Sequence, residues 1–267
     1  MGEGARLMPI YLYIDRRSFI HRLHPTVKVF ALFVMFWSVY WVDSPLALVP
    51  IGIFMAGVAY VIGAWPNFYR LRWLFIMTFT AMVPWLFYNQ GPVLVNVPIL
   101  HLSRYNLIFG FGRGIKLAEL LAASILFLST TKIEEFTVGL QRMGVSYRVG
   151  FAISLAFRLV PLFIESAVTV VDAQTLRGYD FNEGNLLNRL RRYVPVVIPV
   201  FMGALRKANN MAMALEARGF GRTAEPTTFI EYPIVGADIM AFATLAALGA
   251  AYFMLYYTGL GGLGPVK

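Results

Sequence analysis

Five stretches of this chain are apolar and long enough to cross a lipid bilayer as helices. A spanning helix needs about 20 mainly apolar residues, because it rises about 1.5 Å per residue and the hydrocarbon layer is about 30 Å thick. The predicted spans are residues 27–42, 45–65, 71–89, 112–131 and 237–258. We therefore expect an all-α integral membrane protein with about five transmembrane helices.

Composition favours a membrane protein over a soluble one. Of the 267 residues, 58% are hydrophobic and 14% are charged, whereas soluble domains carry about 25% charged residues. The absence of cysteine excludes disulfides, zinc–thiolate sites and iron–sulfur clusters. Residues 1–26 are mixed polar and basic, so we expect no cleavable signal peptide, and the first span itself should direct insertion.

Membrane topology explains the net charge of +9 better than nucleic-acid binding does. Cytoplasmic loops of membrane proteins carry an excess of lysine and arginine. With the N-terminus inside the cell, the cytoplasm receives all but four of the 23 Lys and Arg residues; the exceptions are Arg104, Arg113, Lys116 and Lys267. We expect a multi-pass protein of the cell membrane with a cytoplasmic N-terminus and no nucleic-acid partner. Residues 90–111 contain Gly91, Pro92 and Pro98, which predicts an external loop that could hold a short hairpin.

The stretch between the fourth and fifth spans is neither an ordinary loop nor a clean span. Residues 132–222 hold 12 Lys and Arg, yet much of the stretch is apolar. It is predicted to form three helices, of about 132–142, 146–177 and 185–218. We therefore divide the chain into an N-terminal membrane region (1–131), a central helical region (132–231) and a C-terminal span with its tail (232–267).

The three helices of the central region have distinct patterns. The short one has Glu134 and Glu135 in its first turn, where the helix dipole favours acids. The second has one narrow polar stripe on an apolar helix; the stripe is Ser154, Arg158, Glu165, Thr169 and Asp172. The third has an uncharged centre of 13 residues, which is too short to span and contains Pro195 and Pro199, so we expect it to bend.

Two interpretations of the long helices remain open. In the first, both are ordinary spans, and Arg158 and Glu165 face the interior of a bundle. In the second, which we favour, both are amphipathic and lie at the cytoplasmic surface, with their apolar faces packed on the spans or on each other. A helix of 32 residues is about 48 Å long, which is long for a single perpendicular crossing.

Both long helices end in the same pattern, Ala-x-x-x-Arg-Gly-aromatic. The two copies occupy residues 173–179 and 214–220, which places Arg177 and Arg218 41 residues apart. A single copy would indicate only a helix end, because glycine and basic residues are common there. Two matching copies favour a function. Arginine has five donors and a permanent charge, which suits an acidic or carbonyl-lined groove on another protein, and two such ends suit two related partners.

Three stretches resemble the transmembrane T component of energy-coupling factor (ECF) transporters, the EcfT or CbiQ-type family. The lead-in to the first span, residues 18–28 with His21, His24, Pro25 and Lys28, is similar to the family's H-x-L-x-P-x-x-K pattern. The first coupling signature of the family resembles the set Arg158, Pro161, Glu165, Ala173, Arg177 and Gly178, and the second resembles the set Arg206, Ala208, Ala214, Arg218 and Gly219. With the order of the spans, the resemblance covers roughly residues 13–258. Leu176 departs from the family, in which alanine is commoner before the arginine.

The resemblance implies a complex of this chain with two ATP-binding-cassette ATPases and a small substrate-binding membrane protein, the S component. It implies that the two Arg-Gly ends bind grooves of the ATPases, and that ATP-driven closure moves the long helices to release a vitamin or a metal ion inside. ATP and Mg²⁺ would be bound by the partners. The lead-in residues, together with Arg158, Pro161 and Glu165, are expected to be structural.

No catalytic or cofactor site is expected on this chain. The Gly-rich stretches at 109–116 and 259–264 lack the flanking strand and the G-x-x-x-x-G-K-[ST] pattern of nucleotide sites. His21 and His24 could share a metal ion, but no third ligand is near them in sequence, which favours a structural role. The alternative function is a stand-alone secondary transporter or channel. It would need ionisable groups inside the spans, where Glu119 is the main example.

Overall fold

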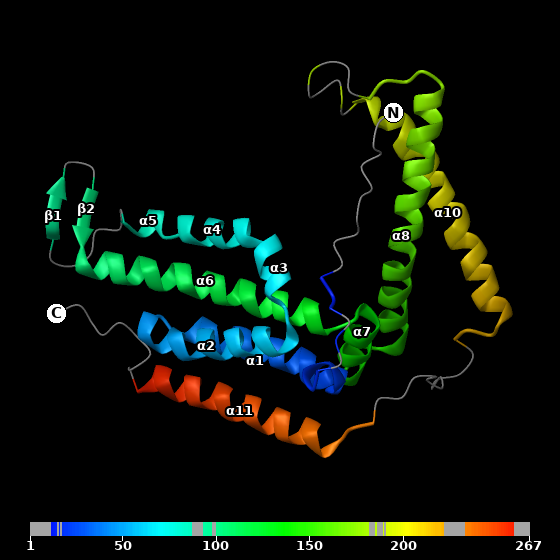
Figure 1. The fold of residues 1–267 in the computed structure, drawn as a ribbon. Coiled ribbons are helices and arrows are strands. Elements are labelled where there is room, and N and C mark those ends of the chain that lie inside the picture. The colour runs from blue at the N-terminus through cyan, green and yellow to red at the C-terminus, as the bar shows by residue number, and fades with distance from the viewer. Residues whose placement is uncertain are drawn as a thin grey trace. The chain divides into compact units, whose positions relative to one another are not determined.

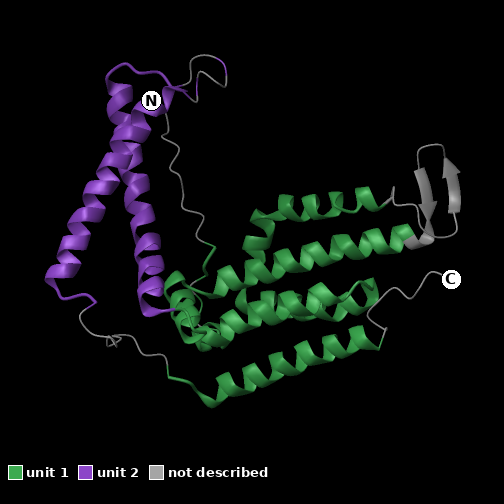
Figure 2. Ribbon diagram, turned by 180° about the vertical axis from the view of Figure 1, so that it is seen from behind, with its two compact units in different colours: residues 1–145, 232–267 green, residues 146–231 purple. Residues whose placement is uncertain are grey.

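The computed structural model describes residues 12–14, 16, 18–86, 93–97, 100–181, 185, 189, 191–221 and 233–258. Helices dominate these residues, with one two-stranded hairpin (Figure 1). The chain forms two compact units: residues 1–145 with 232–267, which we call the bundle unit, and residues 146–231, which we call the two-helix unit (Figure 2).

Helices that run back and forth make up the bundle unit. Its elements are η1 (Ile20–Arg22), α1 (Pro25–Trp41), α2 (Pro45–Ile62), α3 (Trp65–Arg70), α4 (Arg72–Thr80), α5 (Val83–Leu86), β1 (Val93–Val97), β2 (Leu100–Ser103), α6 (Arg104–Thr130), α7 (Ile133–Arg142) and α11 (Gly236–Tyr257). Helix α1 packs on α6, α7 and α11, and α2 packs on α6. The shared core includes Val39, Leu48, Ile51, Ile62 and Ala123. The expectation of an all-α membrane protein is therefore confirmed, apart from the hairpin.

The helix lengths agree in part with the predicted spans. Among the described helices, α2, α8 (Tyr147–Leu176) and α11 combine the length and the apolar composition needed to cross a membrane, and α1 is apolar but has 17 residues. Helix α6 has 27 residues, but Arg113, Lys116 and Glu119 interrupt its apolar sequence. Because α8 also meets the length criterion, the interpretation of the long helices as spans stays open on this ground alone.

The third predicted span, 71–89, is wrong as a continuous helix. Its described part, residues 71–86, is broken into the two helices α4 and α5. Proline lacks the N–H of the helical hydrogen bond, so Pro84 cannot bond to the Thr80 carbonyl, and α4 ends at Thr80. The hydroxyls of Thr78 and Thr80 donate to the carbonyls of Phe75 and Met77 (2.7 Å each).

The segment predicted to be an external loop contains the short hairpin. Strands β1 and β2 pair antiparallel, with Val97 opposite Leu100, and the remainder of the 90–99 stretch lies outside the described residues. Helix α6 begins at Arg104, directly after β2, and not at residue 112 as predicted. The earlier start reflects the lack of any proline after Pro98, so that nothing in 104–111 prevents helix formation.

Two of the four exceptions to the positive-inside rule, Arg113 and Lys116, form ion pairs with the same carboxylate. Asp43, between α1 and α2, lies 3.4 Å from Arg113 and 3.1 Å from Lys116 of α6. The Lys116 ammonium also donates to the Tyr40 carbonyl at the end of α1. Arg113 lies over the rings of Phe109 and Trp85. These cations therefore join the ends of α1 and α2 to α6.

An antiparallel pair of helices, α8 (Tyr147–Leu176) and α10 (Val194–Ala217), forms the two-helix unit (Figure 2). The predicted bounds of α8 are confirmed to within one residue. The third predicted helix, 185–218, is interrupted at Tyr193: residues 189, 191 and 192 are helical, and α10 then begins at Val194, with Tyr193 as its N-cap and Pro195 in its first turn, where proline is favoured. Residues 186–188 and 190 lie outside the described part.

The short helix α7 belongs to the bundle unit, although from sequence we grouped it with the two long helices. It packs on α1 through Gly139. A Cβ atom at Gly139 would stand 2.8 Å from Val29 Cγ2 and 3.1 Å from the Pro25 carbonyl oxygen. Only glycine allows so close an approach. Gly144, with a positive φ of 108°, follows α7 at the end of the unit.

Candidate functional site

The two Arg-Gly ends have the same backbone geometry. Gly178 and Gly219 adopt left-handed φ values of 83° and 75°. At the end of α8, the N–H of Gly178 donates to Thr175 (2.9 Å) and that of Tyr179 donates to Gln174 (3.1 Å). At the end of α10, Gly219 donates to Glu216 and Phe220 donates to Leu215, both at 2.9 Å. Both ends are Schellman motifs, which satisfy the last carbonyls of a helix.

The aromatic residue after each glycine connects that helix end to the start of the other long helix through ring contacts. Phe220, after α10, packs on Phe151 in the first turns of α8 with ring centres 4.5 Å apart. Tyr179, after α8, contacts Phe181 (5.1 Å), which in turn contacts Tyr193 at the start of α10 (5.2 Å). Each Arg-Gly end is thus held against the start of the neighbouring helix. Because the helices are antiparallel, the two ends lie at opposite ends of the pair.

Arg177 and Arg218 are the C-caps of these helices, and both are exposed. Neither side chain forms an ion pair with any carboxylate of the described residues. Ala173 and Ala214 accept hydrogen bonds from the backbone N–H groups of Arg177 (3.3 Å) and Arg218 (3.2 Å). The structure thus holds the backbone of each arginine in place and leaves the guanidinium group available.

Three other signature residues lie on α8 without forming a cluster. Arg158, Pro161 and Glu165 are exposed, and no ion pair joins Arg158 or Glu165 to another described residue. Pro161 lies inside the helix, where it cannot donate to the carbonyl of Phe157. The structure therefore leaves Arg158, Glu165, Thr169 and Asp172 of the polar stripe exposed.

In the bundle unit, the lead-in residues do form a cluster, centred on Lys28. Its ammonium group donates to the carbonyls of His21 (2.9 Å) and Thr130 (3.1 Å) and to the Glu135 carboxylate (2.7 Å). These three acceptors match its three N–H donors. Lys28 and Glu135 side chains are 3% and 15% exposed. This buried ion pair joins η1, α1, the end of α6 and the start of α7.

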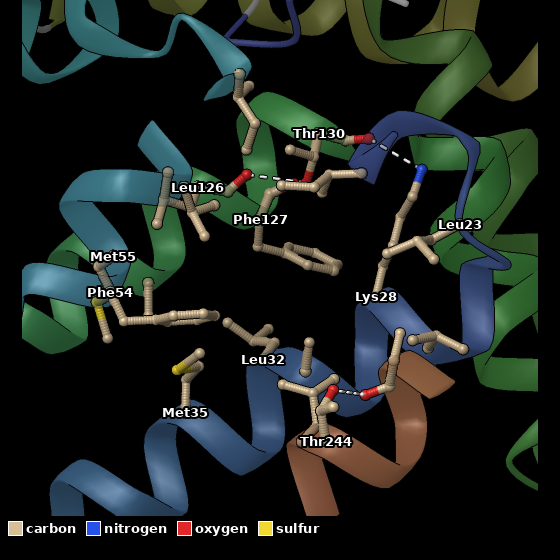
Figure 3. A pocket seen from close by; sticks show the side chains of 18 residues that line it. Leu23, Lys28, Leu32, Met35, Phe54, Met55, Leu126, Phe127, Thr130 and Thr244 are labelled. Atoms are coloured by element: carbon tan, nitrogen blue, oxygen red, sulfur yellow. Dashed lines mark hydrogen bonds between the residues drawn. The ribbon is translucent and has the colours of Figure 1, made fainter. Parts of the chain in front are cut away.

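An apolar pocket explains the direction that Lys28 takes. The pocket, of about 200 Å³, is lined by Leu23, Leu32, Met35, Met55, Leu126 and Phe127, among others. Figure 3 shows the Lys28 side chain extending toward Thr130, with its nitrogen at the Thr130 carbonyl. An unpaired ammonium in an apolar cavity would be costly, so the charge is placed at the rim, where the carbonyl and carboxylate acceptors are.

His24 and Pro25 begin α1, and Asp238 joins them to α11. The ring Nδ1 of His24 accepts from the N–H of Thr26 (3.1 Å), and Pro25 occupies the first helical position. The Asp238 carboxylate accepts from the N–H groups of His24 (2.7 Å) and Val235 (2.8 Å). We call the contacts of Lys28, Glu135, His24 and Asp238 the N-terminal clasp.

The histidines have local roles. His21 lies with Nδ1 2.6 Å from Ser18 Oγ, and burial, with the nearby Lys28 charge, lowers its pKa below the ordinary value of 6.5. In the described part of the chain, no group of three metal-ligating side chains occurs.

From sequence alone, two members of the clasp were not recognised. Glu135 was assigned only to the dipole of its own helix, and Asp238 was not singled out. A weak signal existed for both, since each is an acid in the first turn of a helix. Asn67 was also missed; it is buried, and its amide donates to the Leu12 carbonyl (2.5 Å) and to Ser129 Oγ (2.8 Å).

Comparison with known proteins gives one consistent answer. The family model CbiQ, described as a cobalt transport protein, matches residues 16–228, which include Lys28 and both Arg-Gly ends. The energy-coupling factor transporter transmembrane protein EcfT of Bacillus selenitireducens is 33% identical over 227 residues, which cover 79% of this chain and 84% of the relative. EcfT of Streptococcus thermophilus is 26% identical over 254 residues (91% and 96%), and EcfT of Bacillus subtilis is 25% identical over 260 residues (93% and 98%). The chain belongs to the CbiQ/EcfT family, the transmembrane components of energy-coupling factor transporters.

Proposed function

We propose that this chain transmits ATP-driven movement from two ATPase subunits to a substrate-binding membrane subunit during uptake of a vitamin or a metal ion. The observation that carries the proposal is the pair of matching Arg-Gly ends. Two exposed arginines lie at matching Schellman motifs. The motifs are at opposite ends of a helix pair whose longer helix is about 45 Å long. Two separate partners can therefore bind, one at each end.

The rigidity of the pair supports a mechanical role. The antiparallel helices contact each other, and aromatic contacts hold each Arg-Gly end to the neighbouring helix. A push on Arg177 or Arg218 would therefore move the helix as a body rather than bend a loose end. ATP and Mg²⁺ would be bound and hydrolysed by the partners, and this chain would be a non-catalytic subunit.

The exposed apolar surface of the two-helix unit supports a membrane partner. Both helices expose large apolar side chains, namely Phe157, Val160, Val168, Val197, Phe201 and Met213. Apolar patches of this kind mark binding surfaces for protein or lipid. We propose that they bind the S component and the bilayer surface, which selects the second interpretation of the long helices over the first.

We also propose that the two-helix unit and the N-terminus lie in the cytoplasm, where ATP is present. The lead-in arginines and the central basic residues then obey the positive-inside rule. In this orientation the N-terminal clasp would lie at the cytoplasmic border of the bundle unit, and Asp43 with Arg113 and Lys116 would lie at the outer border. The cargo is selected by the S component, so the residues of this chain do not specify it.

Purification in mild detergent with co-expressed ATPases and S component tests the proposal. The wild-type chain should retain both ATPases, and the variant Arg177→Ala/Arg218→Ala should lose them while its thermal midpoint stays unchanged. Arg70→Ala/Arg148→Ala removes two other exposed arginines and is the charge-matched control. Retention of the ATPases by the Arg177/Arg218 variant, or substrate transport by the chain alone, would show the proposal to be wrong.

A further inference from the structure

A second pocket in the bundle unit has one polar end and one apolar wall. Its volume is about 350 Å³, and it lies where α1 and α11 begin and α7 ends. The polar end is formed by His24, Thr26, Arg142 and Asp238, and the apolar wall by Val27, Ile234, Ile239 and Phe242. None of these side chains takes part in the Arg-Gly ends.

The polar end of this pocket offers hydrogen-bond donors. Arg142 is exposed and makes no ion pair with another described residue. The Thr26 hydroxyl is buried and has no hydrogen-bond partner among the described residues. A cation and a neutral hydroxyl donor are therefore present.

The one carboxylate in the pocket is already used. Each oxygen of Asp238 accepts a backbone N–H, from His24 and from Val235. These N–H groups stand at the starts of α1 and α11, whose partial positive charges offset the carboxylate charge. The remaining charge of the polar end is that of Arg142, and it is complementary to an anion with several acceptor oxygens.

The apolar wall belongs to the surface of a helix long enough to cross the membrane. Ile239 and Phe242 lie on α11 and are 65% and 45% exposed, and the Phe242 ring stacks on Phe30 of α1 with centres 4.2 Å apart. The wall thus continues from the polar end along a membrane helix. A free anion would use only the polar end, whereas an anionic lipid would use both parts.

We propose that this pocket binds an anionic phospholipid of the adjoining leaflet. The Arg142 guanidinium and the Thr26 hydroxyl bind its phosphate, and one acyl chain lies along Ile239 and Phe242. The lipid would bridge α7, α1 and α11 beside the N-terminal clasp. The proposal does not rest on the ATPases or on the S component.

Native mass spectrometry of the full chain in detergent tests the proposal. With added phosphatidylglycerol, the wild-type chain should retain one lipid, and phosphatidylcholine at the same concentration should be retained far less. Arg142→Gln should weaken phosphatidylglycerol binding about tenfold, as loss of a charge-assisted hydrogen bond does. Arg22→Gln, which removes an exposed arginine outside the pocket, should bind as the wild type does.

A second variant and a competing anion distinguish lipid binding from binding of a free anion. Ile239→Gln keeps Arg142 and disturbs only the apolar wall, so it should also weaken lipid binding, and it serves if Arg142→Gln fails to fold. Inorganic phosphate at millimolar concentration should not displace the lipid; displacement would indicate a site for free anions. Equal retention of both lipids, unchanged binding by Arg142→Gln, or loss of the lipid when the ATPases and S component bind would overturn the proposal.

Discussion

The N-terminal clasp and the Arg-Gly ends both depend on basic side chains, and the two use them in opposite ways. Lys28 is 3% exposed and has all three of its donors bonded within the bundle unit. Arg177 and Arg218 are exposed and form no ion pair with the described residues of the two-helix unit. A buried cation with a full set of acceptors stabilises the fold, whereas an exposed cation on a rigid end is available to a partner. The difference separates residues that hold this protein together from residues that we propose bind other proteins.

Replacing Lys28 by methionine should have the largest effect on stability. Met has a similar length, but it leaves the Glu135 carboxylate without its cation, and breaking a buried ion pair costs about 3–5 kcal/mol. All five tryptophans, from Trp37 to Trp85, lie in the bundle unit. Tryptophan fluorescence during thermal unfolding in detergent therefore reports on the unit that carries the clasp.

The matched variant is Arg177→Met, which removes an exposed charge and should change the free energy of unfolding by less than about 0.5 kcal/mol. Lys28→Met/Glu135→Leu should recover most of the loss, because no uncompensated charge then remains. Equal midpoints for Lys28→Met and Arg177→Met would remove the distinction between the two regions.

Glycine substitutions in the two-helix unit should have an intermediate effect. Gly178 has a φ of 83° with no atom within 4 Å of an added Cβ, so Gly178→Ala carries only the cost of the left-handed backbone, about 1–2 kcal/mol. Gly203, inside α10, is equally open but helical, and Gly203→Ala should stabilise the helix by about 1 kcal/mol. Helical circular dichroism during unfolding measures both.

The same pair of variants sharpens the functional side of the comparison. Gly178→Ala disturbs the Schellman end that holds Arg177, so it should weaken retention of one ATPase, while Gly203→Ala should retain both. If the two alanine variants bound the ATPases equally well, the position of the arginine would not depend on the glycine.

The regions also differ in how far they could be predicted from sequence. The Arg-Gly ends could be located because a Schellman motif is made within six consecutive residues, and the bounds of α7, α8 and α11 were right to within one residue. The roles of Arg177 and Arg218 remain predictions, because they depend on partner chains.

The clasp could not be predicted, because its contacts are distant in sequence. Lys28 and Glu135 are separated by 107 residues, and His24 and Asp238 by 214. No local pattern specifies which acid meets Lys28. The break of the third span was missed for the opposite reason: Pro84 was present, but mean apolarity over 71–89 outweighed it in the prediction of a continuous helix.

Lowering the pH should destabilise the bundle unit alone, and by less than the Lys28 or the glycine substitutions change stability. All three histidines, His21, His24 and His101, lie in that unit, and burial lowers the pKa of His21, with the Lys28 charge adding to the effect. His21 therefore stays neutral in the folded state to a lower pH than in the unfolded state. Below pH 6.5 the unfolded state binds the extra proton, so stability falls as pH falls through this range. Tryptophan fluorescence should show a lower midpoint at pH 5.5 than at pH 7.5, and His21→Asn should reduce the difference. The two-helix unit contains no histidine. The prediction would be wrong if the fluorescence midpoint of the wild type stayed constant with pH while helical circular dichroism showed a second transition that acid shifts, because the pH response would then belong to the two-helix unit.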